Sequence, residues 1–143
     1  MKEKPLTATI FNIERHALHD GPGIRTLVFF KGCPLSCLWC SNPEGQGSEP
    51  VLMYHRKECI QCGRCLDACP RSAISPTDDG VVTDRTKCDG CGECVKTCPT
   101  HARCISGKQM TIEEVMDIIV RDEIFYRWSG GGITASGGED ATA

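Results

Sequence analysis

The segment ECIQCGRCLDACP occupies positions 58–70, and KCDGCGECVKTCP repeats it at positions 87–99. Every cysteine of the first copy returns 29 positions later, so that Cys59 corresponds to Cys88. Two copies of one pattern at a fixed offset indicate a small module built from two similar halves. We expect this module to span 53–104 and to be inserted into a second domain formed by 1–52 and 105–143.

The spacing within each copy, CxxCxxCxxxCP, predicts iron-sulfur ligation. In bacterial ferredoxins with this pattern, three closely spaced thiolates and the fourth cysteine of the other copy hold each 4Fe-4S cluster. Tetrahedral zinc is the alternative, although zinc sites usually use two pairs of ligands rather than two triplets. We therefore predict one cluster on Cys59, Cys62, Cys65 and Cys98, and another on Cys88, Cys91, Cys94 and Cys69. Cys104 is left over and is interpreted as a small buried side chain.

The composition favours metal sites over disulfides. The chain has twelve cysteines among 143 residues and a formal net charge of −3. Charged residues interrupt the first twenty positions, which argues against a secretory signal, and the longest apolar run, 27–30, is too short to cross a membrane. We expect a cytoplasmic protein, where thiols stay reduced. The basic residues are scattered, so we expect neither nucleic acid nor membrane as a partner.

The flanks of the module predict an α/β domain. Residues 26–30 form a short apolar run suited to a buried strand, and 111–123 combine a capping box with apolar residues at helical spacing. A second strand is expected between the glycine turns of 129–139. Strand, helix and strand in this order open a parallel α/β architecture, in which functional groups lie on loops at the carboxyl ends of the strands.

A third cysteine motif follows the first expected strand. Cys33, Cys37 and Cys40 have the spacing CxxxCxxC, with no fourth cysteine nearby. Three ligands leave one iron of a cluster open, and an open position is what catalysis at a metal requires. A small molecule could occupy that position through an amine and a carboxylate.

Together these motifs resemble the radical S-adenosylmethionine enzymes that activate glycyl radical enzymes. The resemblance covers nearly the whole chain. It rests on DGPGIRT at 20–26, FKGC at 30–33, CLWCSNPE at 37–44, the inserted module, FY at 125–126 and SGGE at 136–139.

The resemblance implies a third 4Fe-4S cluster on Cys33, Cys37 and Cys40, whose open iron binds S-adenosylmethionine. It also implies that Trp39 lies against adenine and that Gly137, Gly138 and Glu139 receive the methionyl amino group. In that family, S-adenosylmethionine is cleaved reductively and a glycyl radical is installed on the partner enzyme. An external donor such as flavodoxin or ferredoxin would supply electrons, which the module's two clusters would relay; a structural role for those clusters is the alternative.

The implied fold is the N-terminal portion of a partial (β/α) radical S-adenosylmethionine barrel carrying an inserted α+β ferredoxin-like module. Family members are about twice as long, and Asp140 stands where they commonly have proline. We therefore expect a truncated chain that is inactive or poorly stable by itself. The competing interpretation is a ferredoxin-like electron-transfer fragment without S-adenosylmethionine chemistry, which would have no use for the 33–40 and 137–139 segments.

Overall fold

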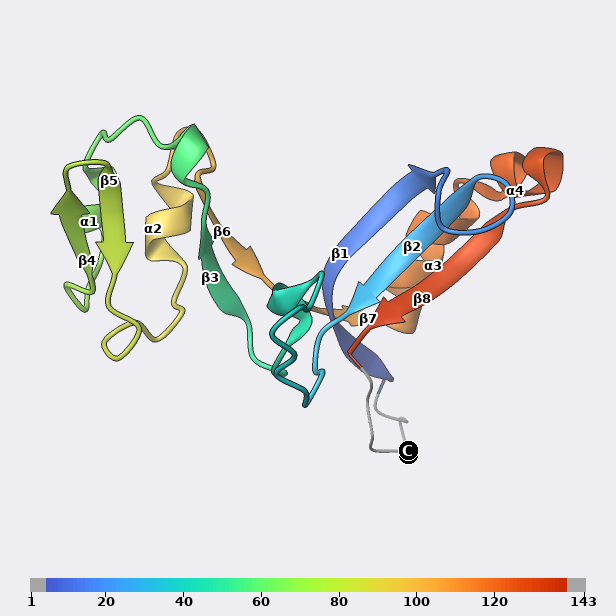
Figure 1. The fold of residues 1–143 in the computed structure, drawn as a ribbon, viewed down its shortest axis with the longest axis horizontal. Coiled ribbons are helices and arrows are strands. Elements are labelled where there is room, and N and C mark those ends of the chain that lie inside the picture. The colour runs from blue at the N-terminus through green and yellow to red at the C-terminus, as the bar shows by residue number, and fades with distance from the viewer. Residues whose placement is uncertain (1–4, 139–143) are drawn as a thin grey trace. The chain divides into compact units, whose positions relative to one another are not determined.

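The fold is mixed α/β, and the chain divides into two compact units. A computed structural model describes residues 5–138 (Figure 1). The sheet unit comprises Met1–Glu49 and Gly107–Ala143, and the repeat unit comprises Pro50–Ser106. The repeat unit extends slightly beyond the expected module, 53–104, because the strands at its two ends pair along their full length.

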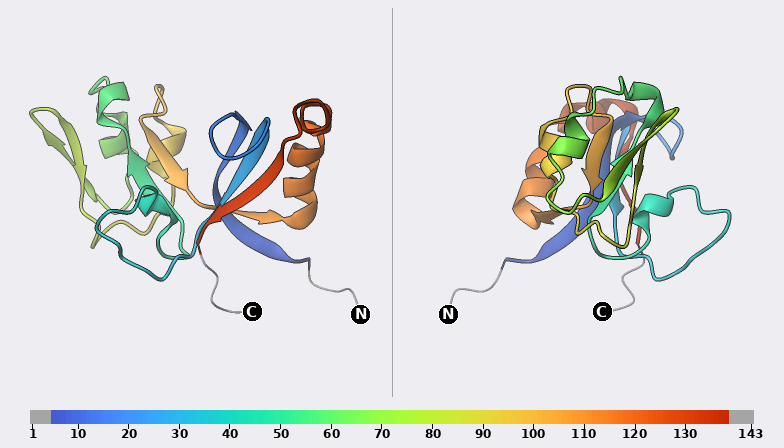
Figure 2. Two further views of the ribbon diagram at one scale, coloured as in Figure 1. Left: turned by 45° about the vertical axis from the view of Figure 1, so that its right-hand side comes forward. Right: turned by 90° about the vertical axis from the view of Figure 1, so that its left-hand side faces the viewer.

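The sheet unit contains four strands in the order β7-β1-β2-β8 (Figure 2). Strand β2 is parallel to β8, with Arg25 opposite Gly132 and Phe30 opposite Gly137. Strand β1 is antiparallel to both β2 and β7. The bounds are Thr7–Ala17 for β1, Arg25–Phe30 for β2, Lys108–Thr111 for β7 and Gly132–Gly137 for β8.

The two expected strands are present and parallel, but the sheet is not purely parallel as the sequence suggested. Strand β1 was not predicted, because charged residues such as Glu14 and Arg15 interrupt its apolar pattern. It is placed instead by pairing with β2, where Ile10 and Val28 are buried in one core cluster. The register of neighbouring strands thus outweighs local composition.

The expected helix over 111–123 ends at Val120, and a further helix that was not predicted follows it. Helix α3 spans Ile112–Val120 and begins with the predicted capping box between Thr111 and Glu114, while α4 spans Glu123–Ser129. Val115 and Ile119 pack against the core of the sheet unit, as the helical spacing predicted. The other three residues of that face are 43 to 56% exposed: Ile112, Met116 and Val120.

Asp122, in the bend between α3 and α4, is a fully buried carboxylate. Arg15 donates through Nε to its Oδ2 at 2.7 Å and through Nη2 to its Oδ1. The Thr26 hydroxyl donates to Oδ2 at 3.3 Å and accepts from the Tyr126 hydroxyl at 2.6 Å. This network joins β1, β2 and the helices, and the hydrogen bond from Arg15 lowers the pKa of Asp122.

Asp122→Asn should reduce the free energy of unfolding by about 2 kcal/mol at neutral pH, because Arg15 loses its anionic partner. The folded-state pKa of Asp122 lies below its ordinary value, so the wild-type advantage is complete above that ordinary value and disappears as pH falls through the folded-state pKa. Urea unfolding followed by circular dichroism at several pH values measures this. The control is Glu123→Gln, which removes a half-exposed carboxylate paired with Arg127 and should cost less than about 0.5 kcal/mol. Equal losses in both variants would contradict the prediction.

The repeat unit is built from two similar halves around one core. Strands β3 (Val51–Tyr54) and β6 (Arg103–Ser106) pair antiparallel, as do β4 (Ile74–Thr77) and β5 (Gly80–Thr83). Two short helices each contain the third cysteine of a triplet, α1 at Arg64–Asp67 and α2 at Glu93–Lys96. The corresponding residues Ala73 and Ala102 are both 1% exposed. Each helix starts at a glycine with positive φ, Gly63 and Gly92, a conformation that favours glycine at this turn.

Candidate metal-cluster sites

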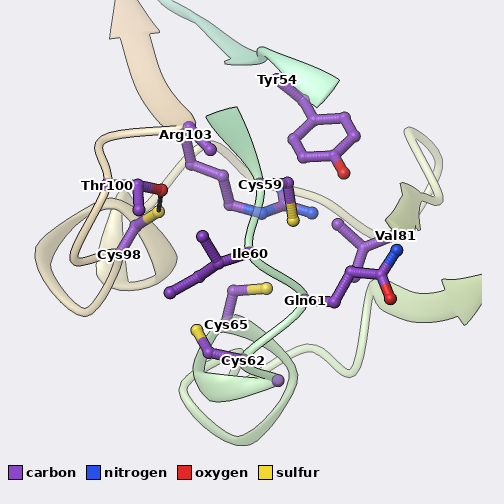
Figure 3. A pocket seen from close by; sticks show the side chains of 12 residues that line it. Tyr54, Cys59, Ile60, Gln61, Cys62, Cys65, Val81, Cys98, Thr100 and Arg103 are labelled. Carbon is purple, nitrogen blue, oxygen red and sulfur yellow. Dashed lines mark hydrogen bonds between the residues drawn. The ribbon is translucent and has the colours of Figure 1, made fainter. Parts of the chain in front are cut away.

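The first cavity of the repeat unit is lined by four thiols drawn from both halves: Cys59, Cys62, Cys65 and Cys98. These are the four residues that the sequence analysis grouped together. Figure 3 shows Cys59, Cys62 and Cys65 on one stretch of chain and Cys98 approaching from the other half.

The second cavity has the complementary set of thiols: Cys69, Cys88, Cys91 and Cys94. At its edge the exposed Arg71 donates through Nε to Asp89 Oδ2 at 3.0 Å, and Asp89 also accepts from the backbone N–H of Cys91 at 3.1 Å. Charge at this edge is therefore already paired.

Two equivalent backbone hydrogen bonds explain why each cavity takes its fourth thiol from the other half. The N–H of His55, just before the first triplet, donates to the carbonyl of Ala102, just after Cys98, at 2.7 Å. The N–H of Asp84, just before the second triplet, donates to the carbonyl of Ala73, just after Cys69, also at 2.7 Å. Each triplet is thereby held beside the fourth cysteine of the opposite copy.

The donor set fits a cluster of several metals. Within residues 5–138, no three His, Cys, Asp or Glu side chains form a group that could hold a single metal ion. The thiols instead surround cavities, as ligands at the corners of an iron-sulfur cube do. At Cys98, burial acts to raise the pKa, but hydrogen bonds led by the backbone N–H of Arg103 outweigh burial and lower it. A lowered pKa favours the thiolate, which is the form that binds metal.

Unpaired polar atoms also point to a missing partner in the first cavity. Arg103 is 1% exposed, and its Nε and Nη2 make no hydrogen bond. The Tyr54 hydroxyl is also buried, and its interaction with the neighbouring Cys59 thiol raises the pKa of Tyr54. Buried polar groups are rarely left unsatisfied, so the lining is suited to a group with acceptor atoms.

The third cysteine motif lies in the sheet unit, on the loop after β2. Cys33, Cys37 and Cys40 are all partly exposed. The carbonyl of Gly45 accepts from the N–H of Gly32 at 2.9 Å and of Cys33 at 3.1 Å, which anchors the start of the loop. Trp39 is 84% exposed and contacts no core cluster, so its predicted place against adenine stays a prediction.

Gly137 and Gly138 lie beside this loop, because parallel strands bring their carboxyl ends to the same edge of the sheet. The N–H of Gly138 donates to the carbonyl of Phe30 at 2.6 Å. A Cβ atom on Gly138 would lie 2.8 Å from the backbone nitrogens of both Gly32 and Cys33. Only a glycine allows this approach without a shift of the backbone. Glu139, the expected acceptor of the amino group, lies outside the described residues.

Lys31 is a functional-site residue that the sequence analysis did not identify. It is 7% exposed and donates through Nζ to the carbonyls of Glu44 at 2.6 Å and Gln46 at 2.9 Å. Burial lowers its pKa. The side chain ties the end of β2 to the turn that closes the cysteine loop, so we assign it a positioning role. Lys31 belongs to the FKGC motif, but a lysine in a strand–loop step usually faces water, so the sequence analysis assigned it no role.

Lys31→Met should loosen the cysteine loop by leaving the two carbonyls without their donor, at a cost of about 2 kcal/mol. We expect faster amide hydrogen exchange at Gly32, Cys33 and Gly47, measured by mass spectrometry on the full chain. The control is Lys108→Met, which removes an exposed lysine from β7 of the same unit and should leave exchange in the loop unchanged. Exchange that is equally slow in both variants would contradict the positioning role.

A helix long and apolar enough to cross a membrane does not occur among the described residues. Residues 58–102 match the family model described as a 4Fe-4S dicluster domain. This match supports iron-sulfur clusters rather than zinc in the repeat unit.

Several curated proteins resemble nearly the whole chain. The isethionate sulfite-lyase activating enzyme of Oleidesulfovibrio alaskensis is 46% identical over 96% of this chain and 46% of its own length. The trans-4-hydroxy-L-proline dehydratase activating enzyme of Clostridioides difficile is 48% identical over 91% and 43%. The benzylsuccinate synthase activating enzyme of Thauera aromatica is 50% identical over 91% and 41%. The chain thus spans less than half the length of these relatives.

Proposed function

This chain belongs to the family of activating enzymes of glycyl radical enzymes, and we propose that it forms the part of such an enzyme that binds S-adenosylmethionine and delivers electrons to it. In this proposal Cys33, Cys37 and Cys40 hold a 4Fe-4S cluster with one open iron. The two thiol-lined cavities of the repeat unit hold two further 4Fe-4S clusters. The enzyme acts on a glycyl radical enzyme as its partner.

The contact of Gly138 with the Gly32–Cys33 step is the observation that carries this proposal. It brings a bare backbone segment to the start of the three-cysteine loop, at the carboxyl edge of the parallel strand pair. An amino acid bound at the open iron would be within reach of both segments. Gly137 and Gly138 would then offer backbone groups to its ammonium, and Glu139 a carboxylate.

A bound, reduced cluster would supply one electron to the sulfonium of S-adenosylmethionine, and cleavage of its carbon–sulfur bond would give methionine and a 5′-deoxyadenosyl radical. The chain's own residues orient and shield this chemistry. Lys31 and Gly45 fix the cysteine loop at its two ends. Trp39, exposed on that loop, is available to stack on adenine.

The repeat unit is proposed to relay electrons from an external donor such as flavodoxin or ferredoxin. Each of its thiol quartets takes three cysteines from one copy of the repeat and one from the other. The two clusters would therefore lie within one small unit, which suits electron transfer between them. Thiolate clusters fit a reducing compartment, so we propose a cytoplasmic location. We propose neither nucleic acid nor membrane as a partner, in keeping with the scattered basic residues.

The test is anaerobic reconstitution of the full chain with iron and sulfide, followed by iron analysis and electron paramagnetic resonance with and without S-adenosylmethionine. Three clusters would give about twelve irons per chain and one signal that changes on adding S-adenosylmethionine. About eight irons and a spectrum that does not change on adding S-adenosylmethionine would leave electron transfer by the repeat unit as the function. A colourless zinc-loaded chain would overturn the proposal altogether.

A further inference from the structure

The two cavities of the repeat unit differ at one buried position. The repeat relates Arg103, in the lining of the first cavity, to Ile74, in the lining of the second. Both side chains are buried, Arg103 at 1% exposure and Ile74 at 7%. An internal duplication would give the clusters similar surroundings, so a buried cation in place of an apolar side chain breaks the equivalence.

The contacts of Arg103 leave most of its donors free. Nη1 donates to Thr83 Oγ1 at 3.0 Å, and the guanidinium carbon lies 5.2 Å from the centre of the Tyr54 ring. Nε and Nη2 have no partner, and no carboxylate within the described residues forms an ion pair with Arg103. Figure 3 shows the side chain running from β6 into the group of cysteines. A buried guanidinium without an anion is strongly disfavoured.

We propose that Arg103 donates hydrogen bonds to the cluster in the first cavity and balances its negative charge. Arg103 thereby raises the reduction potential of this cluster above that of the cluster in the second cavity. This inference rests on the proposed function. A cluster with four thiolate ligands is anionic and gains a further negative charge when reduced. Nε–H and Nη2–H would donate to its sulfurs, and hydrogen bonds to sulfur and net charge are among the factors that set cluster potentials.

The second cavity offers no comparable cation. Its arginine, Arg71, has a side chain that is 61% exposed and is paired with Asp89. Water and the carboxylate screen that charge. The positive charge of Arg103 does reach Cys94 of the second quartet, where it opposes the larger effect of burial on the pKa. Its free N–H groups nevertheless belong to the lining of the first cavity only, so the first cluster should be the preferred electron acceptor.

The test is a redox titration of the reconstituted full chain, followed by electron paramagnetic resonance, in wild type and Arg103→Met. In Arg103→Met, the reduction potential of one cluster should fall by at least about 59 mV, which is a tenfold decrease in the equilibrium constant for adding one electron. The potentials of the other clusters should shift less. Arg103→Lys should give a smaller shift, because it keeps the charge but loses the fork of donors. The controls Arg71→Met and Ile74→Met should move no potential by a comparable amount.

A second measurement uses the wild type and does not depend on how the variants fold. With 15N-labelled arginine, the reduced chain should show a 15N hyperfine coupling to one cluster, and Arg103→Lys should abolish it. Absence of this coupling, or unchanged potentials in an Arg103→Met variant that retains its iron, would overturn the role of Arg103 but not the proposed function. A wild-type chain that fails to bind about eight irons in addition to those of the three-cysteine loop would overturn the proposed function first.

Discussion

Cys37→Ala should lower the iron content of the reconstituted chain from about twelve to about eight and abolish the spectral response to S-adenosylmethionine. Cys37 is the middle ligand of the proposed open cluster, and two remaining thiolates cannot retain a cube that needs at least three. The loop lies in the sheet unit, away in sequence from the quartets of the repeat unit. The two other clusters should therefore assemble normally.

Cys104→Ser is the matched control for this loss of a thiol. Cys104 lines neither cavity and lies 3.6 Å from His55 Nε2, and burial raises its pKa. A thiol held in its protonated form outside both quartets is a poor ligand. The control should keep about twelve irons. Loss of the same four irons in both variants would argue against ligation by Cys37.

Gly131→Ala should destabilise the sheet unit by about 3 kcal/mol or more, because a Cβ atom at this position would overlap the carbonyl oxygen of Ile24. Gly23 faces the same contact, and a Cβ atom there would overlap Gly131 and the Ser129 carbonyl. The loop before β2 and the turn before β8 are thus packed backbone against backbone at the amino ends of the parallel strands. Urea unfolding of the full chain followed by circular dichroism measures the loss.

Gly130→Ala separates this overlap from the general effect of replacing a turn glycine. Gly130 has a φ of 69°, but no atom lies within 4 Å of a Cβ placed on it. The backbone conformation alone should cost about 1 kcal/mol. Equal destabilisation by the two substitutions would show that backbone strain, rather than contact with Ile24, explains the requirement for Gly131.

The cysteine groups could be predicted from the sequence because their spacing repeats. The repeat groups Cys98 with the first triplet and Cys69 with the second, and in the structure each lines the same cavity as that triplet. The helix face over 111–123 was predicted less well. Periodicity identified Val115 and Ile119 as core residues, but it also selected Met116, which the structure leaves 43% exposed. Periodicity shows which side of a helix is apolar, not how much of that side a neighbour covers.

The sequence by itself determined the cysteine groups and part of the local structure, because spacing, capping and strand propensity act over a few neighbouring residues. Only the tertiary structure decided which polar side chains became buried. Nothing near Lys31, Arg103 or Asp122 in the sequence indicates that the side chain is buried, and their pairing depends on partners farther along the chain, such as Thr83 for Arg103 and Arg15 for Asp122. Burial and pairing of a charge depend on the whole surrounding structure, and no pattern within one segment records it.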